Sequence, residues 1–344
     1  MRSMRFCRKT AQPFSPRLVP ALLSLFLLLA ASAAQQTTVR SRSNLVLIPT
    51  LVKDAQGSIV YGLQAQDFII EDNGVQQSVR LDESPEGQPV SLVVAIQRGR
   101  RTFFEFDRMQ GLKSMLSPLF ATGKAKVALV EFDSKVELTR NFTPEERHID
   151  ADLSNLQQGD SGAAILDAIA YSIALLNDEP EDRQRVLLLI SEIHDHGSHV
   201  KIEDAVSAIG RINATMYALT FSPGLSNILD TGRGTNGPAA KNKNEMHPTF
   251  DLMDLAYRTA QLMRKNVPNT VATMTGGEYE LFTTRKKFEI RMNDFTNHLH
   301  SRYLLSFAPQ GPQPGLHQLR VQLKDGGNMA VLARTSYWAE SAQQ

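Results

Sequence analysis

The stretch VSLVVAIQRGRR, residues 90–101, decides the fold. Its first seven residues are almost all apolar, a pattern typical of a strand buried on both faces of a sheet. Residues just past the carboxyl end of such a strand line the crevice in which open α/β sheets bind their ligands. Here that position holds Gln97 and three arginines, Arg98, Arg100 and Arg101. The sequence therefore predicts a binding crevice that begins at Gln97.

Strands alternate with helices from residue 89 to residue 299. This pattern predicts an α/β domain with a doubly wound, mostly parallel sheet and helices on both faces. The segment 223–248 is rich in Gly, Asn and Lys, and we expect a long loop there. Further strands are expected at 126–132, 136–141, 186–190, 215–221 and 278–282, and helices at 103–119, 163–176, 202–212, 252–264 and 288–299.

Short β segments lie on either side of this domain, at 40–88 and 300–340. The first contains an apolar run at 45–52 and the hairpin signal Asp72-Asn73-Gly74, with a return strand expected over 75–81. The second is expected to contain strands at 303–307, 317–323 and 329–334. Neither segment has enough strands for a core of its own. We expect the two to pair into one small all-β, sandwich-like domain into which the α/β domain is inserted.

Residues 1–34 have the order of a secretory signal peptide: basic residues without an acidic one, an apolar run, then small residues. We expect cleavage after Ala33 or Ala34 and export to the periplasm, the envelope or the outside of the cell. An uncleaved anchor is the alternative, since the apolar run approaches the length that spans a membrane. The single cysteine, Cys7, lies in this segment, so the exported chain would contain no disulfide.

The charge of the exported chain argues against nucleic acid as a partner. The full chain has 37 basic and 36 acidic residues, and removing the five basic residues of 1–34 leaves 32 − 36 = −4. Nucleic-acid binding requires a basic patch, which a mildly acidic chain of mixed charge does not favour. The sequence also contains no Gly-x-Ser-x-Gly elbow or other nucleophile motif, so we expect a protein that is not an enzyme.

Several segments together resemble the von Willebrand factor A (VWA) domain, and their flanks resemble the VWA-related family common among exported proteins of acidobacteria. The resemblance implies a VWA-like sheet and a role in protein binding or adhesion. In that family the crevice is a metal-ion-dependent adhesion site. The segments that carry the resemblance are VKDAQGSIVYGLQAQDFIIEDNGVQQSV, VSLVVAI, GDSGAAILDAIAYSIALL, RQRVLLLISEIHDHGS, MTGGEYELF and SRYLLSFAP.

The family's metal ligands are replaced in this chain. Gln97, Gly99 and Arg101 stand where the family has Asp-x-Ser-x-Ser, Ala163 stands at its threonine, and Glu192 stands at its aspartate. Mg²⁺ requires about six oxygen ligands in near-octahedral geometry, which this set does not supply. The resemblance therefore implies a degenerate crevice without metal or other cofactor. Its expected binding residues are Gln97, Arg98, Gly99, Arg100, Arg101, Ser161, Ala163, Glu192 and Asp195.

The arginines of the crevice have two interpretations. They can serve as internal counter-ions for Glu192, Asp160 or Asp195, because a guanidinium can take the place of a cation among carboxylates. They can also capture an acidic group of a protein partner directly.

Two further functions compete with the protein-binding module that we expect. The loop from Glu192 to His199 contains three histidines, His194, His196 and His199, which could bind Zn²⁺ in a metal-dependent hydrolase or a metal-binding protein. Their spacing does not match the helical His-Glu-x-x-His motif. The third possibility is a structural component of the envelope. The sequence specifies neither the partner nor the oligomeric state.

Overall fold

The computed structural model describes residues 45–82, 88–99, 109, 111–221, 252–310 and 312–340. The expected signal peptide, the expected loop at 223–248 and the arginines Arg100 and Arg101 lie outside these residues. Within them, no helix combines the length and the apolar character needed to cross a membrane.

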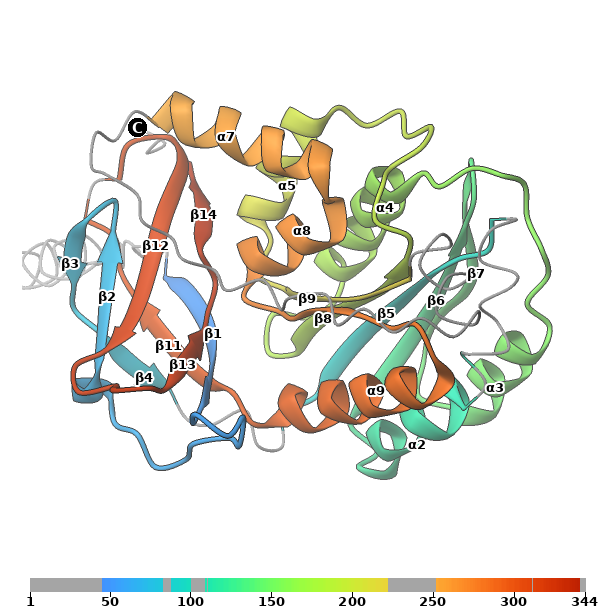
Figure 1. Ribbon diagram of the computed structural model, residues 1–344, viewed down its shortest axis with the longest axis horizontal. Coiled ribbons are helices and arrows are strands. Elements are labelled where there is room, and N and C mark those ends of the chain that lie inside the picture. The colour runs from blue at the N-terminus through green and yellow to red at the C-terminus, as the bar shows by residue number, and fades with distance from the viewer. Residues whose placement is uncertain are drawn as a thin grey trace, which may run out of the picture. The chain divides into compact units, whose positions relative to one another are not determined.

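A six-stranded sheet forms the centre of the α/β part (Figure 1). Its order is β10-β9-β8-β5-β6-β7, and every pair is parallel except β6 with β7. This order and the mostly parallel pairing confirm the doubly wound, VWA-like sheet predicted from the sequence. The strands are β5 (Val90–Gln97), β6 (Ala125–Phe132), β7 (Val136–Thr143), β8 (Gln184–Ser191), β9 (Thr215–Thr220) and β10 (Tyr279–Leu281).

Helices cover both faces of this sheet, as Figure 1 shows. Successive residues of a strand point to opposite faces, so Val93 of β5 packs against one helix layer and Val94 against the other. This two-sided burial is why β5 is apolar almost throughout. One layer consists of α4 (Ile165–Asn177), α5 (Ile202–Arg211), α7 (Leu252–Lys265) and α8 (Val267–Thr275), and the other of α2 (Leu112–Ala121), α3 (Glu146–Ser154) and α9 (Arg285–His300).

The two terminal segments build a β-sandwich together, as predicted. One sheet has the order β13-β1-β11-β4 and the other β14-β12-β2-β3, so each sheet combines strands from both ends of the chain. Ile48, Ile70 and Phe307 lie in the core between them. The elements are β1 (Val46–Lys53), the 3-10 helix η1 (Ala65–Asp67), β2 (Phe68–Asp72), β3 (Val75–Gln77), β4 (Arg80–Asp82), β11 (Tyr303–Phe307), β12 (Gly315–Leu323), β13 (Ala330–Leu332) and β14 (Ser336–Ala339).

The prediction of one continuous return strand over 75–81 is wrong, because two short strands, β3 and β4, lie there. Asn73 and Gly74 do form the hairpin turn, with φ of 49° and 81°. After the turn, β3 pairs with β2, but β4 pairs with β11 in the opposite sheet. The chain therefore crosses between the two sheets within this segment.

Of the helix expected over 103–119, the described part is α2, which begins at Leu112, and most of the expected segment before it lies outside the described residues. Gly111 precedes α2 with φ of 101°, a left-handed conformation that a continuous helix does not contain. The sequence interpretation also omitted α3, α8 and β14. In α8, the Asn266 side chain accepts a hydrogen bond from the Asn269 N–H and Pro268 occupies the first turn, so a second helix starts just after α7.

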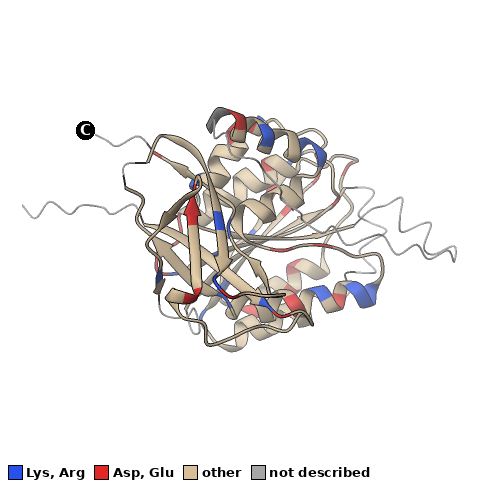
Figure 2. Ribbon diagram, turned by 60° about the vertical axis from the view of Figure 1, so that its left-hand side comes forward, with Lys and Arg blue, Asp and Glu red and all other residues tan. Residues whose placement is uncertain are grey.

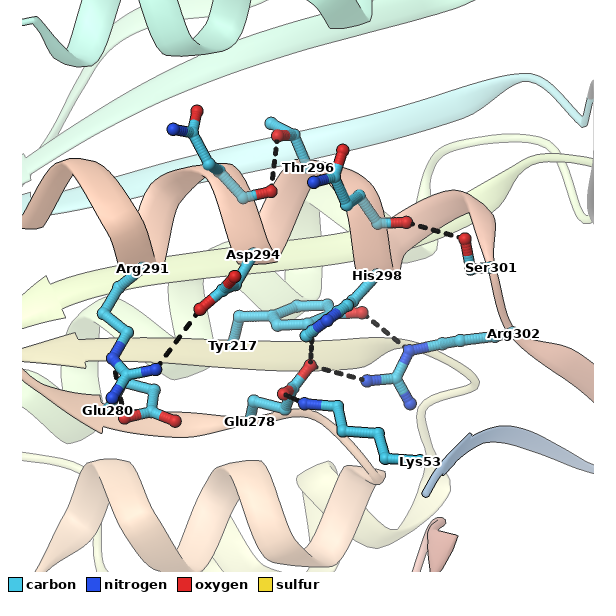
Figure 3. Close-up of polar contacts among 12 residues, drawn as sticks. Lys53, Tyr217, Glu278, Glu280, Arg291, Asp294, Thr296, His298, Ser301 and Arg302 are labelled. Carbon is cyan, nitrogen blue, oxygen red and sulfur yellow. Dashed lines mark hydrogen bonds and ion pairs between the residues drawn. The ribbon is translucent and has the colours of Figure 1, made fainter. Parts of the chain in front are cut away.

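A buried charge cluster joins the sandwich to the α/β part (Figure 3). Glu278, just before β10, accepts hydrogen bonds from Lys53 of β1 at 2.7 Å and from His298 of α9 at 2.8 Å. Arg302 is 2 % exposed, donates to the Tyr217 hydroxyl at 2.7 Å, and lies 3.6 Å from Glu278. Burial raises the pKa of Glu278, but the His298 hydrogen bond and the charges of Arg302, His298 and Lys53 lower it to about 2. The junction therefore depends on an ionised carboxylate.

Figure 2 shows acidic and basic residues scattered over the described helices and strands of the protein. This mixed distribution accords with the small net charge of the sequence, which has 37 basic and 36 acidic residues.

Candidate functional site

The crevice expected from the sequence corresponds to the carboxyl ends of β5 and β8, at the point where the strand order reverses. After β5 the chain leads to α2 on one face of the sheet, and after β8 it leads to α5 on the other. Connections that leave in opposite directions open a crevice between the two strands, where doubly wound proteins bind ligands. Gln97 is the last residue of β5 and Glu192 directly follows β8, so both predicted residues lie at this point.

Gln97 and Glu192 close the floor of the crevice by pairing with each other. The Gln97 Nε2 donates to Glu192 Oε1 at 2.9 Å, and the Glu192 backbone N–H donates to Gln97 Oε1 at 2.9 Å. Gln97 is 1 % exposed and Glu192 is 5 % exposed. Since a backbone N–H can only donate, the second bond fixes which end of the amide is oxygen. Both ends of the amide are therefore engaged within the protein.

Arg98 is an internal counter-ion, but its partners differ from those expected. Its Nε donates to Asp133 Oδ2 at 3.1 Å, and its Nη1 and Nη2 lie 3.4 Å from Glu131 and 3.1 Å from Glu137. Burial lowers the pKa of Arg98, but the charge and hydrogen bond of Asp133 and the other two carboxylates raise it above its usual value. The direct partners of Arg98 are therefore on or next to β6 and β7, and neither Glu192 nor Asp195 is among them. Of the expected partners, Asp160 lies near enough for the charge of Arg98 to lower its pKa.

Close packing of main chain fills the space around this arginine. A Cβ atom on Gly99 would lie 2.6 Å from the Gly162 carbonyl oxygen, and one on Gly162 would lie 2.5 Å from the Ser134 nitrogen. A Cβ on Gly159 would overlap the Asp133 carboxylate. These loops approach so closely that no side chain fits between them. The absence of a side chain at Gly99 therefore allows its loop to pack directly against the main chain of Gly162.

Asp160 holds the loop before α4 in place. Its carboxylate accepts hydrogen bonds from the backbone N–H of Ser134 at 3.0 Å and of Gly162 at 2.8 Å, and from the Ser134 hydroxyl. The Ser134 hydroxyl and the Gly162 N–H lower the pKa of Asp160. The next residue, Ser161, is exposed at the rim, whereas Ala163 is fully buried.

The histidine loop is braced against the amino end of α4. Ala163 and His196 exchange two backbone hydrogen bonds, at 3.1 and 2.8 Å. Asp195 accepts from the Leu166 N–H at 3.0 Å, which satisfies one free donor at the start of the helix. Asp167 accepts from the N–H groups of His199 at 2.9 Å and of Val200 at 2.8 Å. Both acids of this region thus stabilise the loop.

The three histidines of this loop are exposed and do not converge. His199 lies 3.2 Å from Asp167, and His196 contributes its backbone to the contact with Ala163. Among the described residues, no three His, Cys, Asp or Glu side chains are placed to hold a metal ion. The arrangement therefore does not assemble the zinc site considered from the sequence.

The residues at the family's metal position do not fit a divalent cation. The Gln97 amide is used at both ends, Gly99 has no side chain, and Ala163 is a buried methyl group. The nearby carboxylates of Glu131 and Asp133 already surround a guanidinium. Such a set offers few oxygen ligands to Mg²⁺.

The sequence interpretation missed Glu131, Asp133 and Glu137. Glu131 and Asp133 could have been found from the sequence. They lie at the end of the buried strand β6, whose carboxyl end is beside that of β5. Glu137 could not be placed without knowing that β7 turns back antiparallel to β6. Arg100 and Arg101, the remaining predicted arginines, lie outside the described residues.

No family model and no curated protein matches the chain. Similar solved structures include a von Willebrand factor type A protein from Catenulispora acidiphila, at 10 % identity and a TM-score of 0.43, covering 83 % of this chain and 78 % of that one. They also include the PilB minor pilin from Streptococcus sanguinis, at 11 % identity and a TM-score of 0.41, covering 63 % of this chain and 62 % of the pilin.

A third similar structure is proximal thread matrix protein 1 from the mussel byssus, with a zinc-occupied MIDAS motif. Its identity is 12 % and its TM-score 0.42, and the match covers 72 % of this chain and 51 % of the byssus protein. The chain thus spans less than two thirds of the length of the pilin and of the byssus protein.

Proposed function

We propose that this chain is an exported, non-enzymatic protein-binding module whose contact surface is the rim of the crevice and whose binding needs no metal ion. The observation that carries the proposal is the reciprocal pairing of Gln97 with Glu192 at the switch point. In a metal-dependent crevice, a cation bridges the protein to an acidic group of the partner. Here hydrogen bonds between the chain's own amide and carboxyl residue connect the two strand ends directly.

The rim offers a fixed surface above this closed floor. Ser161, His194 and His196 are exposed, and the loops that carry them are held by Asp160, Asp195 and Asp167. Loops that are ordered before binding lose less conformational entropy when a partner docks. In the sequence, Arg100 and Arg101 come directly after Gly99, and guanidinium groups suit an acidic partner. Export rests on the signal-peptide pattern of residues 1–34.

Cross-linking and pull-down from the native envelope fraction test this function. The purified protein serves as bait with EDTA or with Mg²⁺, beside a double variant, His194→Ala with His196→Ala. We expect a specific partner to be captured equally with EDTA and with Mg²⁺, and to be lost with the double variant at an unchanged melting temperature. His148→Ala, on α3 and away from the rim, is the matched control and should retain the partner.

Two outcomes would contradict the proposal. Capture that requires Mg²⁺ would overturn metal-free binding, and capture that the double variant retains would place the contact elsewhere. Recovery of no specific partner would instead favour the structural envelope component, in which the Gln97–Glu192 pair only stabilises the fold.

A further inference from the structure

Strand β12 is paired on one side along only half of its length. Its first half, Gly315–Gln318, pairs with β14, and the Leu319 N–H still donates to the Thr335 carbonyl at 2.8 Å. Beyond Leu319 the two segments separate, because β13 belongs to the opposite sheet and pairs with β1. The other side of β12 pairs with β2 from Leu319 to Leu323. The second half of β12 is therefore an open edge.

Two hydrogen bonds identify the main-chain groups that face this edge. The Asn73 N–H donates to the Gln318 carbonyl, and the Lys324 N–H donates to the Asp67 carbonyl, each at 2.9 Å. Both bonds lie on the β2 side, so the even-numbered residues of β12 direct their backbone groups toward β2. Because these directions alternate along an antiparallel strand, Val321 directs its N–H and C=O to the open side. Among the described residues, no backbone partner lies there for Val321.

A groove of about 200 Å³ runs along this open half. Leu319 and Val321 form one wall, and the partly exposed Val331 and Ala333 of the diverging segment form the other. Arg320 also lines the groove, as do Glu71 and Gly74 from the β2 side of the strand. The groove thus combines unpaired main-chain groups with a small apolar wall.

We propose that this groove binds an extended segment of a protein partner, which adds to β12 as a further strand. An extended polypeptide is the ligand whose donors and acceptors alternate at the spacing that Val321 presents. Its side chains alternate in direction as well, so small β-branched residues would contact Val331 and Ala333 while polar residues face Arg320. An unpaired strand edge of this kind is a template for pairing with another chain. The site is separate from the crevice and does not depend on its function.

The probe for the test is the peptide acetyl-Thr-Val-Thr-Val-Thr-amide, and the readout is amide hydrogen exchange of the purified protein followed by NMR. We expect the peptide to slow exchange at Val321 at least fivefold when bound. The same peptide methylated at every backbone nitrogen cannot donate hydrogen bonds and should give no protection. Equal effects of the two peptides, or no protection by the unmodified peptide at millimolar concentration, would overturn the proposal.

A pair of variants localises the contact. Val321→Pro removes the outward N–H without removing a bond of the β12–β2 ladder, and should weaken peptide binding at least tenfold in a titration followed by chemical shifts. Val321→Thr has nearly the same shape and retains the N–H, so its affinity should stay within about twofold of the original protein. If Val321→Pro binds as well as Val321→Thr, the peptide does not pair with this edge. Should the proline variant not fold, the methylated peptide alone decides.

This test also separates the groove from the crevice. Peptide protection at Val321 should persist in the double variant His194→Ala with His196→Ala, whose effect on the envelope partner tests the proposed function. Loss of protection there would contradict two independent sites.

Discussion

Gln97 shows how one residue changes the chemistry of a crevice while leaving the fold intact. An aspartate at the end of β5 would bring a second carboxylate next to Glu192, and two buried like charges are stable only with a cation or a proton between them. The amide instead both donates to Glu192 and accepts from its N–H. From the sequence, only the resemblance implies that metal ligands are replaced, and the reciprocal pairing depends on where β8 ends relative to β5. Spacing along the chain does not contain that information.

Replacing Gln97 by leucine should destabilise the protein by about 1–3 kcal/mol, because a buried N–H and a carboxylate oxygen of Glu192 lose their partner. Urea denaturation of both proteins measures the difference. Ser161→Ala, at the exposed rim of the same crevice, is the control and should remain within about 0.5 kcal/mol of the original protein. A Gln97→Leu variant of unchanged stability would contradict the role assigned to the pair.

At the scale of elements, the long buried strands were predictable because their apolar runs admit few alternatives. β5, β6, β8 and β9 lie close to their predicted positions. The short elements were not predictable, since α8 follows α7 with one residue between them and β14 has only four residues. Their positions are set by tertiary packing, such as that of Trp338 on β14 near Gly210 of α5.

The sandwich contains a histidine that joins β12 to β2 and β14. His317 lies 2.8 Å from Asp72 through Nδ1 and 2.6 Å from the Gln313 carbonyl through Nε2, and the Tyr337 hydroxyl donates to Asp72 at 2.8 Å. Burial lowers the pKa of His317, but the hydrogen bonds with Asp72 and Gln313 raise it, and the net pKa lies above 6.5. Asp72 at Nδ1 and the Gln313 carbonyl at Nε2 are acceptors that favour the charged imidazolium, while the Asn73 amide nitrogen also lies 3.1 Å from Nδ1.

This raised pKa predicts a loss of stability as the pH rises. The contribution of His317 is fully present below the unfolded pKa, near 6.5, and disappears as the pH rises through the higher folded pKa. The free energy of unfolding, measured by urea denaturation between about pH 5.5 and pH 8.5, should show this decline. The His317→Gln variant should lack this part of the pH dependence. An identical profile for the variant would exclude His317 as its source.

At the scale of the whole molecule, the buried cluster at Glu278 connects the two parts into one unit. Its members come from β1, β9, α9 and the segments that flank β10 and β11, which are far apart in sequence. The insertion of the α/β domain into a sandwich was predictable from the incomplete terminal segments. The cluster at Glu278 was not predictable, because each of its charged residues stands alone in its segment of the sequence and belongs to no motif.

Arg302→Met should destabilise the protein by about 3–5 kcal/mol, because Glu278 and the Tyr217 hydroxyl lose a fully buried partner. Near- and far-UV circular dichroism during urea denaturation measures the loss, and the transitions should coincide if both parts unfold together. Arg285→Met, which removes an exposed pair with Glu289, is the control and should cost less than about 1 kcal/mol. Separate transitions in the original protein would contradict the single unit.

The cluster also predicts a response to acid. The pKa of Glu278 is about 2 in the folded state, below its ordinary value of 4.5. Its contribution is therefore present above about pH 4.5 and is lost as the pH falls through 2. In Glu278→Gln, the acid-induced loss of stability should be smaller between these values, as followed by circular dichroism. A steeper loss of stability in the variant would contradict a stabilising role of the ionised Glu278 carboxylate.

Isothermal titration of the purified protein with Mg²⁺ and Mn²⁺ tests the central claim, that the chain's own side chains close the crevice and no cation does. After removal of metal with EDTA, we expect no saturable heat at millimolar metal and a melting temperature equal to that before treatment. Saturable binding at the crevice, abolished by Gln97→Leu and accompanied by a rise in melting temperature, would contradict the account.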